Sequence, residues 1–364
     1  MVEAAGRIDL SGIAPDMRIG YSTLRNDVTA PGDRRRFCHY AEQRGLKFEI
    51  ARPGGAYDLV VSSSAGDLSE WSRLPRSSRL VLDMVDSYLD EPPAAPRALV
   101  RGAAKFLLGQ TRRLHLNYRA LIEATCRRAD AVICATEEQR DRISKYNSNV
   151  HVILDFQSGE VARVKSDYRR GDTFHLAWEG LGVNIQTFES FATAWRELRR
   201  RHRIELHLVT DLAIPTGSNY IGLRPAREVV KRMLGEGVYL SQWNVTMLAT
   251  ICTACDLAVI PIPLDQPFFA GKPANKLVFF WRMGVPTVTS ATPAYLRAMS
   301  AAGLDMTCRG EGDWVPMIEK LMGDEDARQR AGELGRRYVE REYSEASLLA
   351  RWDRVFESIG GPGA

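Results

Sequence analysis

The feature that most constrains the fold is an alternation of strand and helix patterns that runs along the chain twice. In the first half, apolar segments of strand length at 17–21, 57–62 and 79–86 alternate with segments of helical spacing. The alternation begins again at Phe174, with further strand patterns at 203–209, 237–240 and 256–263. Buried strands separated by helices are typical of parallel sheets covered on both faces. The sequence therefore predicts an α/β protein with two Rossmann-type, doubly wound domains.

Domain boundaries follow from the segment 157–173, which is polar, charged and without periodicity. We expect a loose leader at 1–16, a first domain at 17–160, a linker at 161–173, a second domain at 174–343, and a closing helix with a tail at 344–364. A chain of 364 residues is long enough for two such cores.

Composition excludes several classes of protein. A hydrophobic content of 45% and a charged content of 26% are ordinary for a globular protein. The sequence holds no apolar run of about 18 residues and no signal-peptide pattern, so we expect a cytoplasmic protein. A net charge of +4 permits acidic ligands without requiring them. The pair Cys252 and Cys255 lies between a helix and a strand, which favours a buried structural pair over redox chemistry.

One stretch, 268–290, carries the main functional signal. It reads as a polar loop with Gly271 and Lys272, a helix that begins at Pro273 and contains Lys276, and a strand. Lysines in the first helical turn are disfavoured by roughly 0.3–1 kcal/mol each, because the exposed N–H groups already carry positive potential. A bound phosphate reverses that effect and uses the same N–H groups. The sequence thus indicates an anion site here, and the alternative is two solvated lysines.

Other candidates follow the ends of predicted strands. Gly180, Gly182 and Asn184 form a glycine-containing loop after the strand at 174–178, where a backbone can approach a diphosphate. Trp243 follows the strand at 237–240 and either stacks on a nucleotide base or packs at the start of the next helix. Asp86 ends the strand pattern at 79–86 and is either a general base or a helix N-cap.

Two charged segments have alternative interpretations. The stretch 97–119 includes the basic residues Arg101, Lys105, Arg112 and Arg113 among leucines and has no acidic residue. It is either an amphipathic surface for an anionic membrane or a lipid-linked acceptor, or a surface helix pair. The sequence contains no nucleic-acid-binding module, so we expect no nucleic-acid partner. The D-x-D triplet at 324–326 precedes a helix, which favours capping over metal binding.

Several of these segments resemble a known family. Seven residues in the 268–290 stretch match the donor-site segment of GT-B glycosyltransferases, particularly chains similar to bacterial glycosyltransferase families 1 and 4: Lys272, Asn275, Lys276, Leu277, Gly284, Pro286 and Ser290. The segment 129–133 resembles a second motif of these enzymes. The resemblance implies a GT-B-like fold whose two domains face a central cleft, with a last helix that crosses back onto the first domain. It also places Gly32, in the loop after the first strand, on the acceptor side.

This chain departs from the family at three points. The two glutamates of the family motif, one of which holds the donor ribose, fall on Gly271 and Phe279. The arginine and lysine that usually follow the glycine loop are replaced by Asn184, Gln186 and Thr187. Lys272 and Lys276 therefore have to supply most of the positive charge for a diphosphate.

The leading hypothesis is a glycosyltransferase that moves a sugar from a nucleotide diphosphate donor to a hydroxyl of a glycan or lipid-linked acceptor. The resemblance implies bacterial polysaccharide or envelope glycan synthesis, at the inner face of the membrane. In this hypothesis Asp86 is the base, residues Ala274–Lys276 neutralise the leaving diphosphate, and neither a metal nor a cofactor is required. The first alternative is a non-catalytic GT-B-like binding or scaffold subunit, and the second is a nucleotide-sugar epimerase.

Overall fold

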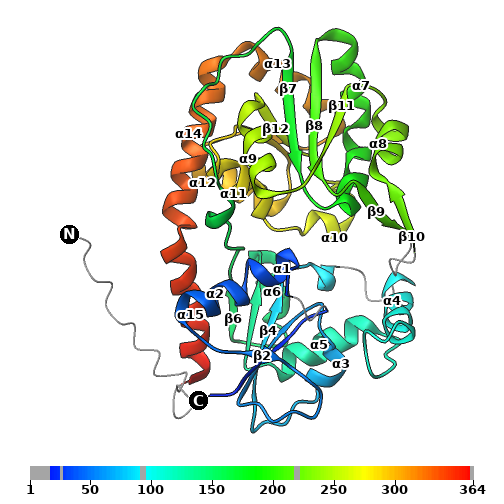
Figure 1. Cartoon of the computed structure of the whole chain (residues 1–364), viewed down its shortest axis with the longest axis vertical. Coiled ribbons are helices and arrows are strands. Elements are labelled where there is room, and N and C mark those ends of the chain that lie inside the picture. The colour runs from blue at the N-terminus through cyan, green and yellow to red at the C-terminus, as the bar shows by residue number, and fades with distance from the viewer. Residues whose placement is uncertain (1–16, 25–27, 91–95, 217–221, 361–364) are drawn as a thin grey trace, which may run out of the picture. The chain divides into compact units, whose positions relative to one another are not determined.

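The computed structural model describes residues 17–24, 28–90, 96–216 and 222–360 (Figure 1). The leader expected at 1–16 lies outside this range. The chain forms two compact units. The first unit comprises Met1–Asp155 and Glu345–Ala364, and the second comprises Phe156–Ser344.

The first unit is built on a six-stranded sheet in the order β2-β1-β3-β4-β5-β6, and every neighbouring pair of strands is parallel. The strands are β1 (Ile19–Ser22), β2 (Glu49–Ile50), β3 (Leu59–Ser63), β4 (Arg79–Met84), β5 (Ala131–Cys134) and β6 (Val150–Val152). Strands β1, β3 and β5 are buried along their whole length, as expected for a sheet covered on both faces.

The helices of the first unit begin and end at recognisable sequence signals. They are α1 (Pro31–Arg34), α2 (Phe37–Arg44), α3 (Leu68–Trp71), η1 (Tyr88–Asp90), α4 (Pro96–Leu107), α5 (Tyr118–Arg128), α6 (Glu137–Ile143) and α15 (Glu345–Gly360). Helix α6 is capped by Thr136, whose hydroxyl accepts a hydrogen bond from the Gln139 amide at 3.1 Å. Helix α2 ends at Gly45, whose φ of 64° suits glycine.

The closing helix α15 packs against α2. The ring of Tyr40 stacks on Trp352 and Phe356, with centroid separations of 5.4 and 5.2 Å. Asp353 is buried and accepts hydrogen bonds from Arg44 at 2.6 and 2.9 Å. Aromatic burial and a bidentate ion pair together hold the end of the chain to the first unit.

The second unit contains another parallel six-stranded sheet, in the order β11-β8-β7-β12-β13-β14. The strands are β7 (Phe174–Glu179), β8 (Ile204–Thr210), β11 (Val238–Gln242), β12 (Leu257–Ile260), β13 (Thr287–Ser290) and β14 (Thr307–Cys308). Counted within the unit, this is the order 3-2-1-4-5-6 of a doubly wound nucleotide-binding sheet. The prediction of two doubly wound α/β halves is confirmed.

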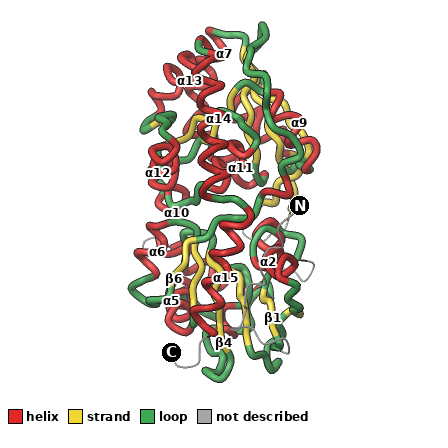
Figure 2. The backbone as a smooth tube through the Cα atoms, turned by 90° about the vertical axis from the view of Figure 1, so that its left-hand side faces the viewer, coloured by secondary structure: helices red, strands yellow, loops and turns green. Residues whose placement is uncertain are grey.

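Helices cover both faces of this second sheet (Figure 1). They are η2 (Ser158–Glu160), η3 (Gly182–Phe191), α7 (Ala192–Arg201), α8 (Ala226–Leu234), α9 (Val245–Ala254), α10 (Pro267–Ala270), α11 (Asn275–Arg282), α12 (Pro293–Ala302), η4 (Glu311–Asp313), α13 (Trp314–Gly323) and α14 (Glu325–Glu342). Helices α14 and α11 pack side by side, and a Cβ at Gly335 would collide with the Trp281 ring (Figure 2). Asp324 caps α14 by accepting from the Ala327 amide at 2.8 Å, so capping of the D-x-D triplet is confirmed.

Two features of the second unit differ from what the sequence predicted: a hairpin after β8 and the position of the segment 161–173. An antiparallel hairpin of β9 (Ala213–Thr216) and β10 (Gly222–Pro225) follows β8 and was not predicted from the sequence. The segment expected as a linker, 161–173, lies against the second unit through two buried side chains. Lys165 donates to the carbonyls of Thr253 and Cys255 at 3.2 and 2.8 Å, and Tyr168 donates to the carbonyl of Gly284 at 2.8 Å.

Cys252 and Cys255 are buried and not bonded to each other, in agreement with a structural role. Over the described part of the chain, no helix combines the length and hydrophobicity needed to cross a bilayer.

Candidate functional site

The site lies where the strand order of the second sheet reverses. Strand β7 is hydrogen-bonded to β8 on one side and to β12 on the other. Because consecutive connections leave β7 and β12 toward opposite faces of such a sheet, a crevice opens at their carboxyl ends, and ligands bind there. The loop after β7 carries Gly180 and Gly182, and the segment after β12 carries Lys272 and Lys276. These four residues, predicted separately as donor-site residues, thus follow neighbouring strands.

Lys276 is the central side chain of the site. Its ammonium lies 4.2 Å from the centre of the Trp178 ring, over the penultimate residue of β7. The described residues offer this ammonium no hydrogen bond and no ion pair. A Cβ at Gly180 would force this ammonium to shift, and the φ of 152° at Gly180 strains any residue with a side chain, so glycine suits this position.

The surroundings of Lys276 disfavour its positive charge. Burial lowers its pKa to about 8; Glu179 opposes this change, and the positive charge of Lys272 adds to it. Near neutral pH the group is therefore charged, half-buried and poorly compensated.

Lys272 joins the two loops directly. Its ammonium donates a hydrogen bond of 2.9 Å to the side-chain oxygen of Asn184, which is 88 positions earlier in the chain. The same ammonium lies 5.1 Å from the centre of the Phe269 ring. Asn184, which stands where the family has a basic residue, therefore holds one of the two lysines in place.

Helix α11 begins two residues later than predicted. Its first residue is Asn275, its N-cap is Ala274, and Pro273 precedes the cap. The difference arises because the chain makes a turn at 274 before the i→i+4 hydrogen bonds begin. Lys272 therefore lies ahead of the helix, while Lys276 is in its first turn. Ala274 has no side-chain acceptor, so no side-chain cap occupies this end of α11.

The other predicted donor residues lie near the site in different roles. The amide of Gly182 donates to the Asp211 carboxylate at 2.9 Å, so it shapes the loop and is not open to a phosphate. The amide of Gly271 donates to the carbonyl of Pro267 at 2.9 Å. The carbonyl of Asn275 accepts from the side-chain amide of Gln157 at 3.1 Å. Phe279 is fully buried on α11, where it packs in the core of the unit.

Trp243 follows β11 and is partly exposed. Its amide donates to the carbonyl of Thr210, the last residue of β8, at 3.0 Å. The Thr210 hydroxyl is buried and finds no hydrogen-bond partner among the described residues. Helix α9 is capped by Asn244, whose side chain accepts from the Met247 amide at 2.9 Å. The edge of the site beside Trp243 therefore has an aromatic ring and an unsatisfied hydroxyl.

In the first unit, Asp86 lies two residues after β4, in a bend that precedes η1, and is partly exposed. Gly32 is exposed within α1. The first unit also contains a buried charge network that was not predicted from the sequence. Arg36 is completely buried and donates to both carboxylate oxygens of Asp83 at 2.6–2.9 Å and to Asp155 at 3.0 Å. The position of Asp83 at the end of an apolar strand was the one signal for it.

The predicted basic segment, 97–119, is only partly helical: it comprises most of α4, a loop that carries Arg112 and Arg113, and the start of α5. Helix α4 ends at Leu107, and both arginines lie in the loop before α5 because Asp67 and Ser69 accept their backbone amides at 2.9 and 3.3 Å. Arg113 is also paired with Glu70 at 3.1 Å.

The rest of the segment 97–119 combines a hydrogen-bonded lysine with exposed apolar side chains. Lys105 donates to the hydroxyl of Tyr118 at 3.0 Å, and the side chain of Arg101 lies outside the described residues. Large apolar side chains are exposed along α4 and the following loop: Val100, Phe106, Leu107, Leu108, Leu114 and Leu116.

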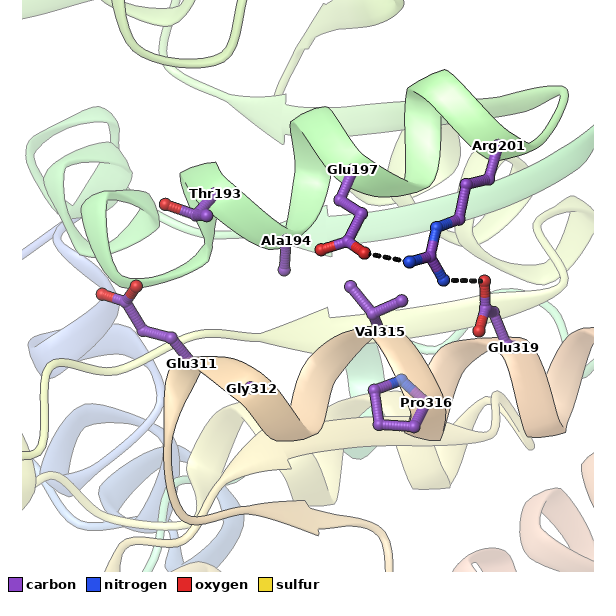
Figure 3. Close-up of a pocket in the computed structure, with 9 residues that line it drawn as sticks. All are labelled: Thr193, Ala194, Glu197, Arg201, Glu311, Gly312, Val315, Pro316 and Glu319. Carbon is purple, nitrogen blue, oxygen red and sulfur yellow. Dashed lines mark hydrogen bonds and ion pairs between the residues drawn. The ribbon is translucent and has the colours of Figure 1, made fainter.

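A separate pocket of about 310 Å³ lies between α7 and α13 (Figure 3). Figure 3 shows Arg201 pointing toward Glu197 and Glu319, and it is paired with both carboxylates. Its lining has three carboxylates, from Glu197, Glu311 and Glu319, and one arginine, so the pocket is net negative. A negative pocket does not suit a diphosphate, and we do not assign it to the donor.

Together, the two doubly wound sheets and the position of the site define the GT-B fold, the two-domain fold of many glycosyltransferases. Solved structures of this fold are similar to the chain. Sucrose-phosphate synthase from Thermosynechococcus elongatus matches with a TM-score of 0.58 and 14% identity, over 89% of this chain and 76% of that one. HepE from Anabaena, solved with UDP and glucose, matches with a TM-score of 0.56 and 12% identity, over 94% and 100%.

TarM from S. aureus matches with a TM-score of 0.53 and 12% identity, and the chain spans about half of its length, 54%. No family model and no curated protein sequence matches the chain. The GT-B fold predicted from the sequence is confirmed.

Proposed function

We propose that this protein is a glycosyltransferase that takes a nucleotide diphosphate sugar as its donor. The observation that carries the proposal is the Lys276 ammonium, held over Trp178 at the β7–β12 switch point without an anionic partner at hydrogen-bonding distance among the described residues. A diphosphate supplies the missing negative charge. The UDP and glucose in HepE, a protein of the same fold, support this choice of ligand.

In the proposed reaction the bond between the sugar's anomeric carbon and the diphosphate breaks, and a bond to an acceptor oxygen forms. Lys272, Lys276 and the amides at the start of α11 stabilise the charge that develops on the leaving diphosphate. We assign Asp86 to accept the acceptor hydroxyl's proton. We also propose that the two lysines replace a divalent metal in this role.

Trp243 is proposed to stack on the nucleotide base, beside the unsatisfied hydroxyl of Thr210. Ribose binding differs from that of the family, because Gly271 and the buried Phe279 bring no carboxylate to it. We propose that Phe279 affects the donor only indirectly, through the packing of α11.

For the acceptor we propose a glycan or a lipid-linked hydroxyl, in polysaccharide or envelope glycan synthesis. The exposed apolar side chains of α4 and its loop, together with Arg112, support contact with an anionic membrane surface on the cytoplasmic side. Liposome flotation tests this surface. Leu107→Ser and Leu116→Ser should together weaken binding to anionic vesicles, and unchanged flotation would exclude the membrane role.

The donor is tested by thermal shift with UDP-, GDP-, dTDP- and CMP-sugars, using wild type, Lys276→Ala and the control Lys320→Ala, an exposed lysine on α13. We expect one donor to stabilise wild type and the control but not Lys276→Ala. If no donor stabilises the wild type, the proposal fails.

The missing carboxylates at Gly271 and Phe279 favour one alternative, a non-catalytic nucleotide-sugar-binding subunit. An assay with candidate acceptors separates the glycosyltransferase from the non-catalytic subunit. Only a transferase releases free nucleotide from the stabilising donor. Asp86→Asn should abolish turnover while leaving the donor's thermal shift intact if the protein is an enzyme.

A further inference from the structure

Three potential metal ligands converge on two neighbouring strands of the second sheet. His175 is the second residue of β7, and Glu205 and His207 are in β8. The register pairs His175 with Glu205 and Ala177 with His207, so all three side chains are on the same face of the sheet. These positions lie before the carboxyl ends of the strands, apart from the proposed donor site.

The ligand atoms are spaced as a metal ion requires. The Nδ1 of His175 is 3.1 Å from the Nε2 of His207 and 3.5 Å from the Oε2 of Glu205. The Nε2 of His207 is 3.9 Å from the same oxygen. In a tetrahedral zinc site with bonds of about 2.0–2.1 Å, neighbouring ligand atoms are about 3.3–3.4 Å apart. The three separations bracket this value, so an ion can bind with shifts of a few tenths of an ångström.

A neighbouring tyrosine orients two of the ligands. The hydroxyl of Tyr239 on β11 donates a hydrogen bond of 3.1 Å to the Oε1 of Glu205. The Oε2 of Glu205 is thereby left directed toward the histidines. The Tyr239 ring also stacks on the His207 ring, with a centroid separation of 5.3 Å and an angle of 18°. Groups that fix metal ligands in this way are a regular part of protein metal sites.

The ion has a route to the cluster. The side chains of His175, Glu205 and His207 are 36%, 29% and 26% exposed, so the site is open to solvent and a fourth ligand can be water. Two imidazoles and one carboxylate are a donor set that Zn²⁺ accepts, and Zn²⁺ ranks high among divalent metals for such ligands.

We propose that His175, Glu205 and His207 form a zinc site that links β7 to β8 and stabilises the sheet of the second unit. Because the cluster is distinct from Lys272 and Lys276, this inference does not depend on the proposed transferase activity. The competing explanation is that the three side chains only hydrogen-bond to one another.

The test uses the full chain without a histidine tag, treated with EDTA and then dialysed. Co²⁺ serves as the spectroscopic probe, since a tetrahedral site with nitrogen and oxygen ligands gives visible absorption bands. Zn²⁺ should displace Co²⁺ at one equivalent. It should also raise the unfolding temperature, by about 5 °C at a hundredfold excess over Kd.

Variants separate the cluster from adventitious binding. His207→Ala and Glu205→Gln should lose the Co²⁺ bands and the Zn²⁺ stabilisation, while the control His202→Ala, which removes a histidine paired with Glu319, should keep both. Tyr239→Phe retains all three ligands and should weaken Zn²⁺ binding about 10–100-fold. That variant tests the proposal even if His207→Ala fails to fold.

Two results would overturn the proposal. One is a wild-type protein that binds no stoichiometric metal. The other is metal binding that is unchanged in His207→Ala and Glu205→Gln.

Discussion

Replacing Lys276 with methionine should stabilise the protein while it removes donor binding. Methionine keeps the apolar stem of the side chain, which packs over Trp178, and removes the charge. In the folded protein, burial lowers the pKa of Lys276 from its ordinary 10.5 to about 8. A change of this size corresponds to about 3 kcal/mol against the charged form if it is expressed fully. Because the side chain is only half-buried, solvent screens part of this cost, and we expect a gain of about 1–2 kcal/mol at pH 7.

The sign of this effect fixes its pH dependence. Between the folded value of about 8 and the unfolded value of about 10.5, the unfolded wild-type chain binds more protons than the folded one, so wild-type stability rises with pH in that window. The advantage of Lys276→Met should therefore be complete below about pH 8 and shrink toward pH 10.5.

The measurement is chemical unfolding of wild type, Lys276→Met and the exposed control Lys320→Met, at pH 7 and at pH 10. We expect Lys276→Met to have the higher midpoint at pH 7 and a smaller lead at pH 10. A Lys276→Met variant that is less stable than wild type at pH 7, or a difference independent of pH, would refute the account of this lysine.

Three further predictions follow from the same contacts. Donor affinity, measured by calorimetry, should fall as the pH rises above about 8, because Lys276 loses its proton there; constant affinity from pH 7 to 9.5 would contradict this. Gly180→Ala should lower stability by about 1–3 kcal/mol and abolish the donor's thermal shift, since a Cβ at a φ of 152° is strained and collides with Lys276, whereas Gly310→Ala, with open space around it, should do neither. Arg36→Ala should cost about 3–5 kcal/mol in a denaturant melt because it leaves the Asp83 and Asp155 carboxylates without their buried partner, and a loss below 1 kcal/mol would contradict the role of this network.

Most of the fold could be predicted from the sequence, because the patterns that mark strands and helices are set by residues close together in the chain. Strands at 79–84 and 174–179 are mainly apolar, and caps such as Thr136 and Asp324 lie beside the helices they start. The hairpin β9–β10 was missed because its strands are short and each contains a proline, Pro215 or Pro225, which is atypical of strands.

The residues of the candidate site could be predicted from the sequence, but the contacts between their side chains could not. Lys272 and Lys276 stood out because they are cations at a helix start. Their contacts with Asn184 and Trp178 could not be predicted, because these residues lie 88 or more positions away and are brought close only by the order of the strands. The cluster of His175, Glu205 and His207 needed the register of β7 against β8, which a single sequence does not supply. Arg36 was indistinguishable from Arg34 and Arg35 until the helix break at 35–36 turned it inward.

The most direct test of the central claim is a crystal structure of the full chain with the nucleoside diphosphate of the donor that stabilises it. The account predicts a diphosphate within hydrogen-bonding distance of the Lys276 ammonium and the first amides of α11, with the base against Trp243. A diphosphate bound elsewhere, with Lys276 still over Trp178 and without contact to the ligand, would contradict it.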